Sequence, residues 1–198
     1  MTLIRCATTN AGKLREFRLA ANHFGFHQVS IEPIEYLHCL PECVEDGQTF
    51  DDNAVIKAIH YSVHVHRPVF ADDSGLVVAA LDGAPGVRSA RFAGPGATDE
   101  DNNRLLIERL AGVENRIAWF KCVVALAHEG RLLGTFKGSV EGRITLAPRG
   151  ANGFGYDPLF FHEPFGCTFG EVDAARKLAV SHRGQAIEQM LKFVCANL

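Results

Sequence analysis

Long apolar runs are missing from this chain of 198 residues, and so is any excess of basic charge. No stretch approaches the ~20 consecutive apolar residues that a membrane-spanning helix needs. The apolar run after Met1 is too short for a secretory signal peptide. Lysine and arginine number 20 against 23 acidic residues, giving a formal net charge of −3 that argues against a nucleic-acid binder. We therefore expect a soluble, cytoplasmic protein with no membrane or nucleic-acid partner.

Cysteine is present, but its pattern does not indicate a disulfide framework or a zinc site. The six cysteines are scattered, and several lie in apolar runs. Disulfide frameworks are usual in shorter secreted chains, so free thiols in a reducing compartment are the better interpretation. Cys39 and Cys43 beside His38 faintly resemble metal ligands, but no second ligand pair stands at the spacing of a zinc site.

Strand-like and helix-like segments alternate along the chain, which favours a layered α/β fold. We expect strands over residues 3–7, 68–71, 76–81, 119–127, 131–137, 140–145 and 159–161. Helices are expected over residues 14–24, 98–110 and 173–180, and from residues 49 and 181 onward. A tight connection at 128–130 predicts a hairpin and hence a mixed sheet. Residues 31–46 are acidic and irregular, which is typical of a loop or an edge.

Two adjacent carboxylates follow a buried run at Asp72 and Asp73, just before Ser74 and Gly75. Carboxylates beside a buried strand are costly unless they are paired or bind a metal. Successive strand residues point to opposite faces, so both enter one site only if the backbone turns, as Gly75 would permit. A Mg²⁺ site and an ordinary turn with solvated carboxylates are both consistent with this pattern.

A polar loop joins the first expected strand to the first expected helix. Backbone amides and the helix dipole favour an anion at such a place. The loop lacks the glycine and lysine spacing of a Walker A motif. Phosphate binding and simple capping of the helix by Asn10 therefore both remain open. The residues of this loop are Thr8, Thr9, Asn10, Ala11, Gly12 and Lys13.

A second loop, over residues 153–158, alternates glycines with two aromatic residues, Phe154 and Tyr156. Glycines let flat rings stand clear of the backbone, as stacking on a base requires. Asp157 offers acceptors for a ring N–H. The alternative, and the commoner situation, is a glycine-rich turn whose aromatic residues are buried.

Cationic and donor groups gather near the expected start of the last helix, at Lys177 and at Ser181, His182 and Arg183. The helix dipole disfavours positive charge there, so a ligand that satisfies these donors is one interpretation. A serine cap with exposed basic neighbours is the other.

The acidic run over residues 99–103 resembles the start of a calcium-binding loop. The sixth position of the pattern is Arg104, where a calcium loop needs glycine. Acidic residues in the first turn of a helix explain the run better.

Taken in order, these segments resemble the inosine/xanthosine triphosphate pyrophosphatase family. The resemblance spans nearly the whole chain, and the order and spacing of its motifs are specific. The motifs cover residues 9–13 with 15–16, then 45–50, 71–76, 83–86, 89–92, 153–158 and 181–186. The resemblance implies an α/β fold with an elongated mixed sheet flanked by helices. It also implies a single domain over residues 1–198 with two lobes, a nucleotide cleft between the lobes, and a homodimer.

The resemblance also assigns roles by motif position. Asp73 and Lys13 are the expected catalytic residues, and Asp73 and Glu45 the expected Mg²⁺ ligands. The triphosphate is expected to contact Thr8, Thr9, Asn10, Ala11, Gly12, Lys13 and Ser74. The base and sugar are expected to contact Phe154, Gly155, Tyr156, Asp157, Lys177, His182 and Arg183. The inward position of Lys57 suits a phosphate contact or an ion pair with Asp73 or Glu45. The chain departs from the family at Asp52, usually glutamate, and at Val44, often acidic.

The implied activity is hydrolysis of non-standard purine nucleoside triphosphates (ITP, dITP and XTP) to the monophosphate and pyrophosphate, which removes them from the nucleotide pool. A water oriented by Asp73 would attack the α-phosphorus, and Lys13 would offset charge on the leaving group. Donors from His182 or Arg183 would favour the 6-oxo group of the base. Two alternatives remain: a Maf-like pyrophosphatase for pyrimidine or modified nucleotides, and a non-catalytic nucleotide-binding protein.

Overall fold

The computed structural model describes residues 1–198 and contains a seven-stranded sheet in the order β2-β1-β3-β4-β5-β6-β7. β1 pairs in parallel with β2 and β3, whereas β6 pairs antiparallel with β5 and β7, so the predicted α/β fold with a mixed sheet is confirmed. The strands are β1 (Thr2–Cys6), β2 (Val29–Pro33), β3 (Val69–Val78), β4 (Ile117–His128), β5 (Arg131–Ile144), β6 (Phe160–His162) and β7 (Cys167–Thr168). The α-helices are α1 (Ala11–His23), α2 (Phe50–Ser62), α3 (Asp99–Arg109), α4 (Ala174–Leu178) and α5 (His182–Asn197). Short 3-10 helices lie at Leu37–Cys39, Ala79–Leu81, Gly86–Arg91, Glu163–Phe165 and Phe169–Glu171.

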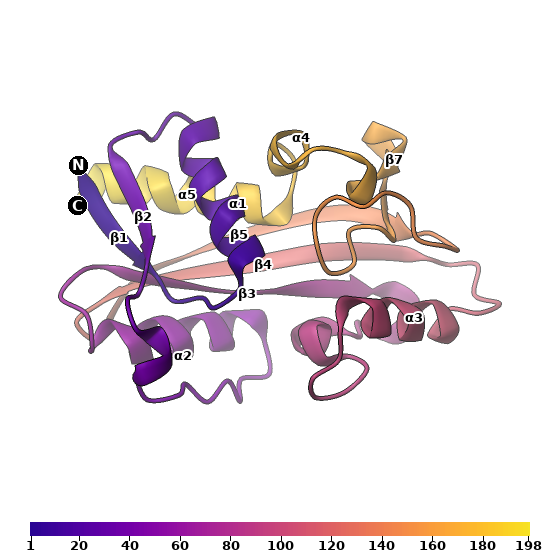
Figure 1. Ribbon diagram of the computed structural model, residues 1–198, viewed down its shortest axis with the longest axis horizontal. Coiled ribbons are helices and arrows are strands. Elements are labelled where there is room, and N and C mark those ends of the chain that lie inside the picture. The colour runs from indigo at the N-terminus through magenta and orange to yellow at the C-terminus, as the bar shows by residue number, and fades with distance from the viewer. The chain divides into compact units, whose positions relative to one another are not determined.

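The chain forms two compact units, each assembled from separate stretches. Unit 1 consists of Met1–Asp73, Cys122–Gly138 and His182–Leu198, and unit 2 of Ser74–Lys121 and Ser139–Ser181. In unit 1, α1 and α5 lie on one face of the sheet and α2 on the other (Figure 1). In unit 2, α3 lies on one face and α4 on the opposite side (Figure 1).

The core of unit 1 follows the period of two along β3. Val69 and Ala71 pack in a cluster with Ala54 and Ala58 of α2. Phe70 points to the other face, where its ring meets that of Phe17 of α1 edge-on at 5.1 Å between centroids. Alternate residues of β3 therefore face α2 or α1, and this alternation decides where the polar residues that follow will point.

The core of unit 2 is built on aromatic rings packed at a tilt to one another. The Phe160 ring lies 4.4 Å from that of Phe120 and 5.1 Å from that of Phe169 between centroids. Leu106 and Leu110 of α3 belong to the same fully buried cluster. Their burial fixes α3 against the sheet, because large aliphatic and aromatic side chains contribute most of the free energy of burial.

Several predicted element boundaries are wrong. The polar break expected at residues 72–75 does not exist, since β3 runs through it without interruption. Gly75 serves close approach rather than a turn, because a Cβ there would stand 2.2 Å from Ser89 Oγ. Residues 140–145 continue β5 instead of forming a separate strand, and part of the expected loop over 31–46 belongs to β2. The hairpin at 128–130 is confirmed, with positive φ at Glu129 and Gly130 as a tight two-residue turn requires.

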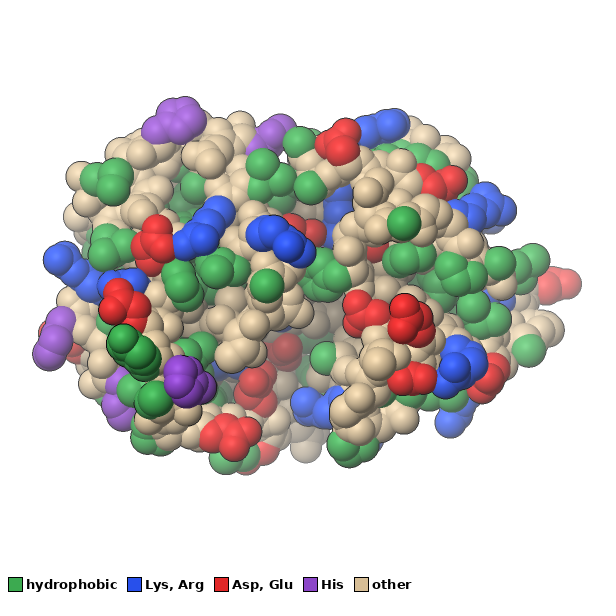
Figure 2. All heavy atoms as spheres, viewed as in Figure 1, with side chains coloured by type: hydrophobic (Ala, Val, Ile, Leu, Met, Phe, Trp, Pro, Cys, Tyr) green, Lys and Arg blue, Asp and Glu red, His purple; other side chains and the backbone are tan.

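Charged side chains are spread over the face of the molecule seen in Figure 2. On the face seen in Figure 2, acidic and basic side chains are interspersed. The large apolar residues that remain exposed include Tyr36, Val44 and Leu146. No helix combines the length and the apolar character that a membrane crossing would require.

Replacing Gly138 of β5 by alanine is expected to destabilise unit 1. A Cβ there would stand 1.9 Å from the backbone oxygen of His182. We expect a loss of about 3 kcal/mol in urea unfolding, the upper end for overpacking, because backbone yields less easily than a side chain. Gly134→Ala is the matched control in the same strand, since its Cβ would meet only the Phe136 ring at 3.1 Å. Equal unfolding midpoints for the two variants would contradict this prediction.

Candidate functional site

Because β3 does not turn, Asp72 and Asp73 point to opposite faces of the sheet. Asp72 continues the face of Phe70, toward α1 and α5, and Asp73 continues the face of Ala71, toward α2. The two carboxylates therefore have different partners and different electrostatic surroundings. The expectation that both share one pocket through a turn at Gly75 is wrong.

Asp72 is buried in a network of charges. Its Oδ2 lies 2.8 Å from Lys13 Nζ of α1 and 3.9 Å from Arg183 Nε of α5. Arg183 also forms an ion pair with Glu16 of α1. Burial alone would raise the pKa of Asp72, but Lys13, Arg183 and Lys57 outweigh it and lower the pKa to about 2. Asp72 is therefore a fixed negative charge that holds Lys13 in place.

The loop before α1 is a helix N-terminus with a side-chain cap. Asn10 Oδ1 accepts the backbone N–H of Lys13 at 3.0 Å, and Thr8 Oγ1 accepts that of Asn10 at 3.1 Å. No acidic residue lies in the first turn of the helix. The capping interpretation of Asn10 is thus confirmed, and it leaves the positive end of the helix beside the Lys13 ammonium group, where an anion is favoured.

Asp73 lies on the α2 face in contact with a polar side chain. Its Oδ2 accepts a hydrogen bond of 3.1 Å from Asn53 Nδ2, and Asn53 Oδ1 accepts the backbone N–H of Gly47 at 2.9 Å. Burial raises the pKa of Asp73, although Asn53, Lys57 and Lys13 act in the opposite direction. A carboxylate with a raised pKa is a better proton acceptor near neutral pH than an ordinary one.

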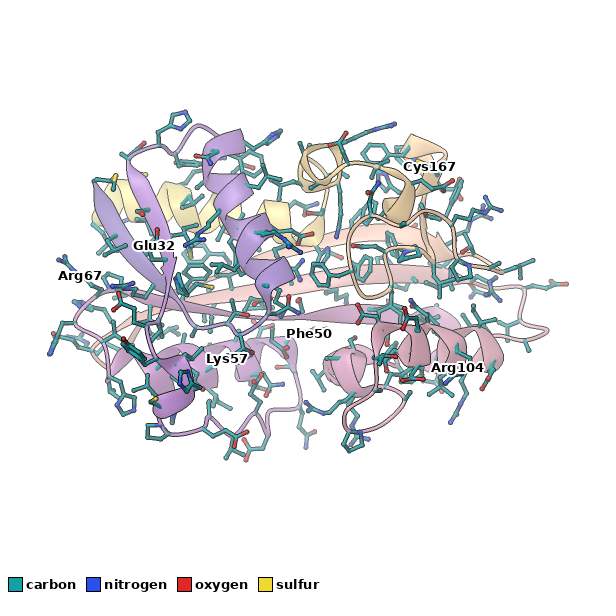
Figure 3. The ribbon with its side chains drawn as sticks, in the orientation of Figure 1. Glu32, Phe50, Lys57, Arg67, Arg104 and Cys167 are labelled. Carbon is teal, nitrogen blue, oxygen red and sulfur yellow. The ribbon has the colours of Figure 1, made fainter.

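Lys57 joins Glu45 to this cluster. It reaches from α2 to β3 (Figure 3), where its Nζ donates to the backbone oxygen of Asp72 at 3.1 Å. The same Nζ lies 2.6 Å from Glu45 Oε2. Burial would lower the pKa of Lys57, but Asp72, Glu45 and Asp73 together raise it. Of the two interpretations of Lys57, the ion pair with Glu45 is the one that the structure contains.

The carboxylates of Glu45 and Asp73 suit a hard cation that needs few protein ligands. No group of three or more His, Cys, Asp or Glu side chains gathers to form a complete metal cage. Mg²⁺ does not need one, because it commonly takes one or two carboxylates and completes its shell with waters and phosphate oxygens. Both donors are carboxylates, and their hard oxygen atoms fit Mg²⁺ better than they fit a metal that needs nitrogen or sulfur ligands.

Unit 2 contributes the second glycine-rich loop. Asp157 is buried, and its Oδ2 lies 2.5 Å from Lys177 Nζ and accepts the backbone N–H of Phe154 at 2.9 Å. Lys177 Nζ also lies 5.1 Å from the centroid of the half-buried Phe154 ring. Tyr156 is buried and donates its hydroxyl to the backbone oxygen of Ser89 at 2.8 Å. Asp157, Lys177 and Tyr156 therefore shape the loop that carries Phe154.

The expected site residues fall into one group in each unit. In unit 1 the network described above brings together Lys13, Arg183 and the Asp72 carboxylate, and Lys57 brings Glu45 to β3. His182 and Arg183 are each only 3% exposed at the start of α5, so they are buried rather than the exposed neighbours of a serine cap. Members in unit 1 are Thr8, Thr9, Asn10, Ala11, Gly12, Lys13, Glu45, Asp73, His182 and Arg183; those in unit 2 are Ser74, Phe154, Gly155, Tyr156, Asp157 and Lys177.

Three polar residues of unit 1 were not assigned from the sequence. Asp72 anchors Lys13, Glu16 pairs with Arg183, and Asn53 holds Asp73. Glu16 lies three residues after Lys13, on the buried side of α1 next to Phe17. A charged residue on the apolar face of a predicted helix was the available signal, because such a residue needs a buried partner.

Comparison with known proteins places these motifs in one family. The sequence model of the Ham1 family matches residues 4–193. A dITP/XTP pyrophosphatase of Syntrophobacter fumaroxidans is 47% identical over 198 residues, which cover 96% of this chain and 84% of the relative. The solved Ham1 protein of Staphylococcus aureus aligns over 100% of both chains at 34% identity with a TM-score of 0.87. A HAM1 protein of Coxiella burnetii aligns over 99% of this chain and 100% of its own at 39% identity with a TM-score of 0.86.

Proposed function

Because the chain belongs to the Ham1 family, we propose that it is a nucleoside-triphosphate pyrophosphatase that hydrolyses dITP, ITP and XTP to the monophosphate and pyrophosphate. The observation that carries this function is the arrangement around β3. It presents one carboxylate held by a cationic helix start and, on the opposite face, a second carboxylate whose pKa is raised. Lys13 also acts on the pKa of Asp73, so the cationic helix start and the second carboxylate lie within electrostatic range of each other. Hydrolysis of a phosphate anhydride needs both an anion site and a proton acceptor.

The triphosphate end of the substrate is assigned to unit 1. Thr8–Lys13 supplies amides, hydroxyls and the Lys13 ammonium group to phosphate oxygens. Asp73 orients the attacking water and accepts its proton. Lys13 offsets the charge that develops on the leaving pyrophosphate, and Asp72 keeps the lysine aimed at that position.

Magnesium is the cation that we assign to this reaction, with Asp73 and Glu45 as its protein ligands. When bound, it supplies positive charge that polarises the phosphate and lowers the pKa of the attacking water. Lys57 holds the Glu45 carboxylate through its ion pair of 2.6 Å.

The base end is assigned to Phe154 and Lys177 of unit 2. Phe154 offers a ring face for stacking, as its half-buried position in the glycine-rich loop allows. A hydrogen-bond donor that faces the base would match the 6-oxo group of hypoxanthine and xanthine, whereas the 6-amino group of adenine would leave such a donor unpaired. A buried unpaired donor costs about 1–3 kcal/mol, which is enough to favour oxo over amino bases.

The cellular location and the oligomeric state complete the assignment. We assign the protein to the cytoplasm, because its substrates belong to the nucleotide pool. We also assign it as a homodimer, on the resemblance described above. The molecular mass in solution, measured by light scattering, tests the second assignment against the 21.6 kDa of one chain.

Release of pyrophosphate from purified protein with Mg²⁺ is the experiment that tests this function. We expect release from dITP, ITP and XTP at least tenfold faster than from ATP, since one unpaired buried donor is worth about that factor. Little release is expected from GTP or dTTP, although guanine shares the 6-oxo group and must be rejected by other contacts. EDTA is the control and should abolish release. A preference for dTTP would identify a Maf-like enzyme, and tight binding without release would identify a nucleotide-binding protein.

A further inference from the structure

The loop that carries Phe154 is held from outside by two side chains of α3. Asp99 Oδ2 accepts the backbone N–H of Gly155 at 2.7 Å, and Asn103 Nδ2 donates to the backbone oxygen of Gly155 at 3.0 Å. Residues four apart lie on the same face of a helix, one turn apart. One helix face therefore satisfies both polar backbone atoms of the residue next to Phe154.

The inner side of the same loop is held independently. Phe154 donates its backbone N–H to Asp157, and Asp157 pairs with the buried Lys177. Gly153 and Gly155 both have positive φ, a backbone region that glycine adopts without steric cost. The glycines on each side of Phe154 would allow this backbone to move. Hydrogen bonds from two directions hold it in place.

Phe154 and Gly155 lie at the outer edge of the loop, on its α3 side. A cavity of about 460 Å³ lies there, lined by Asp99, Asn103, Phe154 and Gly155 among others. Phe154 and Gly155 are only partly buried beside this cavity, so directed hydrogen bonds contribute much to their position. The hydrogen bonds from Asp99 and Asn103 to Gly155 therefore have a large effect on the position of the Phe154 ring.

The asparagine side chain at position 103 lowers the stability of the folded protein. The residue is buried, and its Oδ1 has no hydrogen-bond partner. A buried acceptor without a partner is destabilising, and an apolar residue would fill a helix face in the core better. The bond from Nδ2 to Gly155 gives a reason for asparagine at this position that packing does not.

We propose that Asp99 and Asn103 are positioning residues for base recognition, which hold Gly155 so that the Phe154 ring stands where a purine base stacks on it. This proposal rests on the function assigned above and deepens it, because it names residues outside the family motifs that control affinity for the base. Both residues act through the backbone of Gly155. The acidic run that resembles a calcium loop is, in this assignment, the outer support of the base site.

The test is a split between KM and kcat. Asp99→Ala and Asn103→Ala should each raise the KM for dITP about five- to tenfold, the size of one net hydrogen bond. The kcat should stay within about twofold, because the reacting phosphate is not affected. Asp99→Asn keeps an acceptor for Gly155 and should restore the KM. The double variant should fall short of the product of the two effects, since both bonds hold one residue.

Two controls separate positioning from damage to the helix. Glu100→Ala removes an exposed acid from the same first turn and should leave the KM unchanged. Asp101→Ala breaks the capping box that Asp101 forms with Thr98, so it should lower the melting temperature without raising the KM. A raised KM in the Asp101 variant equal to that of Asp99→Ala would show a merely structural role and overturn the proposal.

A readout without turnover keeps this inference distinct from the proposed reaction. Hydrogen exchange of the Gly155 amide should become faster in Asp99→Ala and stay slow in Asp99→Asn. Binding of IMP, measured by calorimetry, should weaken by the same factor as the KM rises. A wild type that binds IMP but releases no pyrophosphate would refute the reaction alone. Unchanged IMP affinity in a variant whose Gly155 amide exchanges faster would refute the positioning role.

Discussion

Replacing Asp73 by asparagine is expected to lower pyrophosphate release from dITP roughly a thousandfold, within the 10²–10⁴-fold range for a lost general base. Asparagine keeps the shape of the side chain and an acceptor for Asn53 Nδ2, but it cannot take the proton of the attacking water. Its neutral amide is also a weaker ligand for Mg²⁺ than a carboxylate. The loss should therefore fall on kcat.

The same variant should be at least as stable as the wild type. Burial raises the folded-state pKa of Asp73. A carboxyl group with a raised pKa costs stability above that pKa, because the folded protein then holds a charge that the unfolded chain solvates better. Removing the charge removes this cost, and a gain in stability with a loss of activity is typical of a functional residue.

Asp51→Asn is the control for this experiment. Asp51 is on α2, where it forms a largely exposed ion pair with Lys137. Exposed pairs contribute little, so we expect turnover within about twofold of the wild type and a melting temperature nearly unchanged. Near-normal turnover in the Asp73 variant would overturn the assignment of Asp73 as the proton acceptor.

The parts of the fold that follow from local rules could be predicted from the sequence. Thr49 and Thr98 begin helices because each forms a capping box with the acid three residues later. The hairpin at 128–130 follows from its tight glycine-containing connection. These features depend on neighbours within a few residues, which a single sequence displays.

The continuity of β3 could not be predicted in this way. Two adjacent aspartates and a glycine are a turn signal by composition. Each carboxylate is instead compensated by a partner distant in sequence, Asp72 by Lys13 and Asp73 by Asn53. The strand survives because these partners exist, and only the tertiary structure shows them.

The candidate site shows the same division between local and distant information. The motifs identified the residues, but not the burial of His182 and Arg183 or the pairing of Arg183 with Glu16. The support that α3 gives to the Phe154 loop was also invisible, because Asn103 and Gly155 lie 52 residues apart. The spacing of a motif predicts which residue types take part, whereas the contacts that aim them come from elsewhere in the chain.

Replacing Lys13 by methionine is expected to destabilise the metal-free protein by about 3 kcal/mol at pH 7, the lower end for breaking a buried ion pair, because Arg183 still faces Asp72. The pH dependence identifies the cause. Lys13 and its neighbours hold the pKa of Asp72 at about 2, against an ordinary value of 3.8. A lowered folded-state pKa stabilises the protein above 3.8, and this contribution fades as the pH falls toward 2.

Without Lys13 the pKa of Asp72 must rise, since burial opposes the charge and a large compensating interaction is gone. The difference in free energy of unfolding between the wild type and Lys13→Met should therefore narrow as the pH falls from 7 to 3.5. Urea unfolding in EDTA measures this difference. Adding Asp72→Asn to the methionine variant should recover much of the loss at pH 7. Lys192→Met, which removes the lysine of an exposed pair with Glu188, should cost less than about 1 kcal/mol at every pH. If the loss of unfolding free energy in the Lys13 variant does not change with pH, the charge of Asp72 is not the cause of that loss.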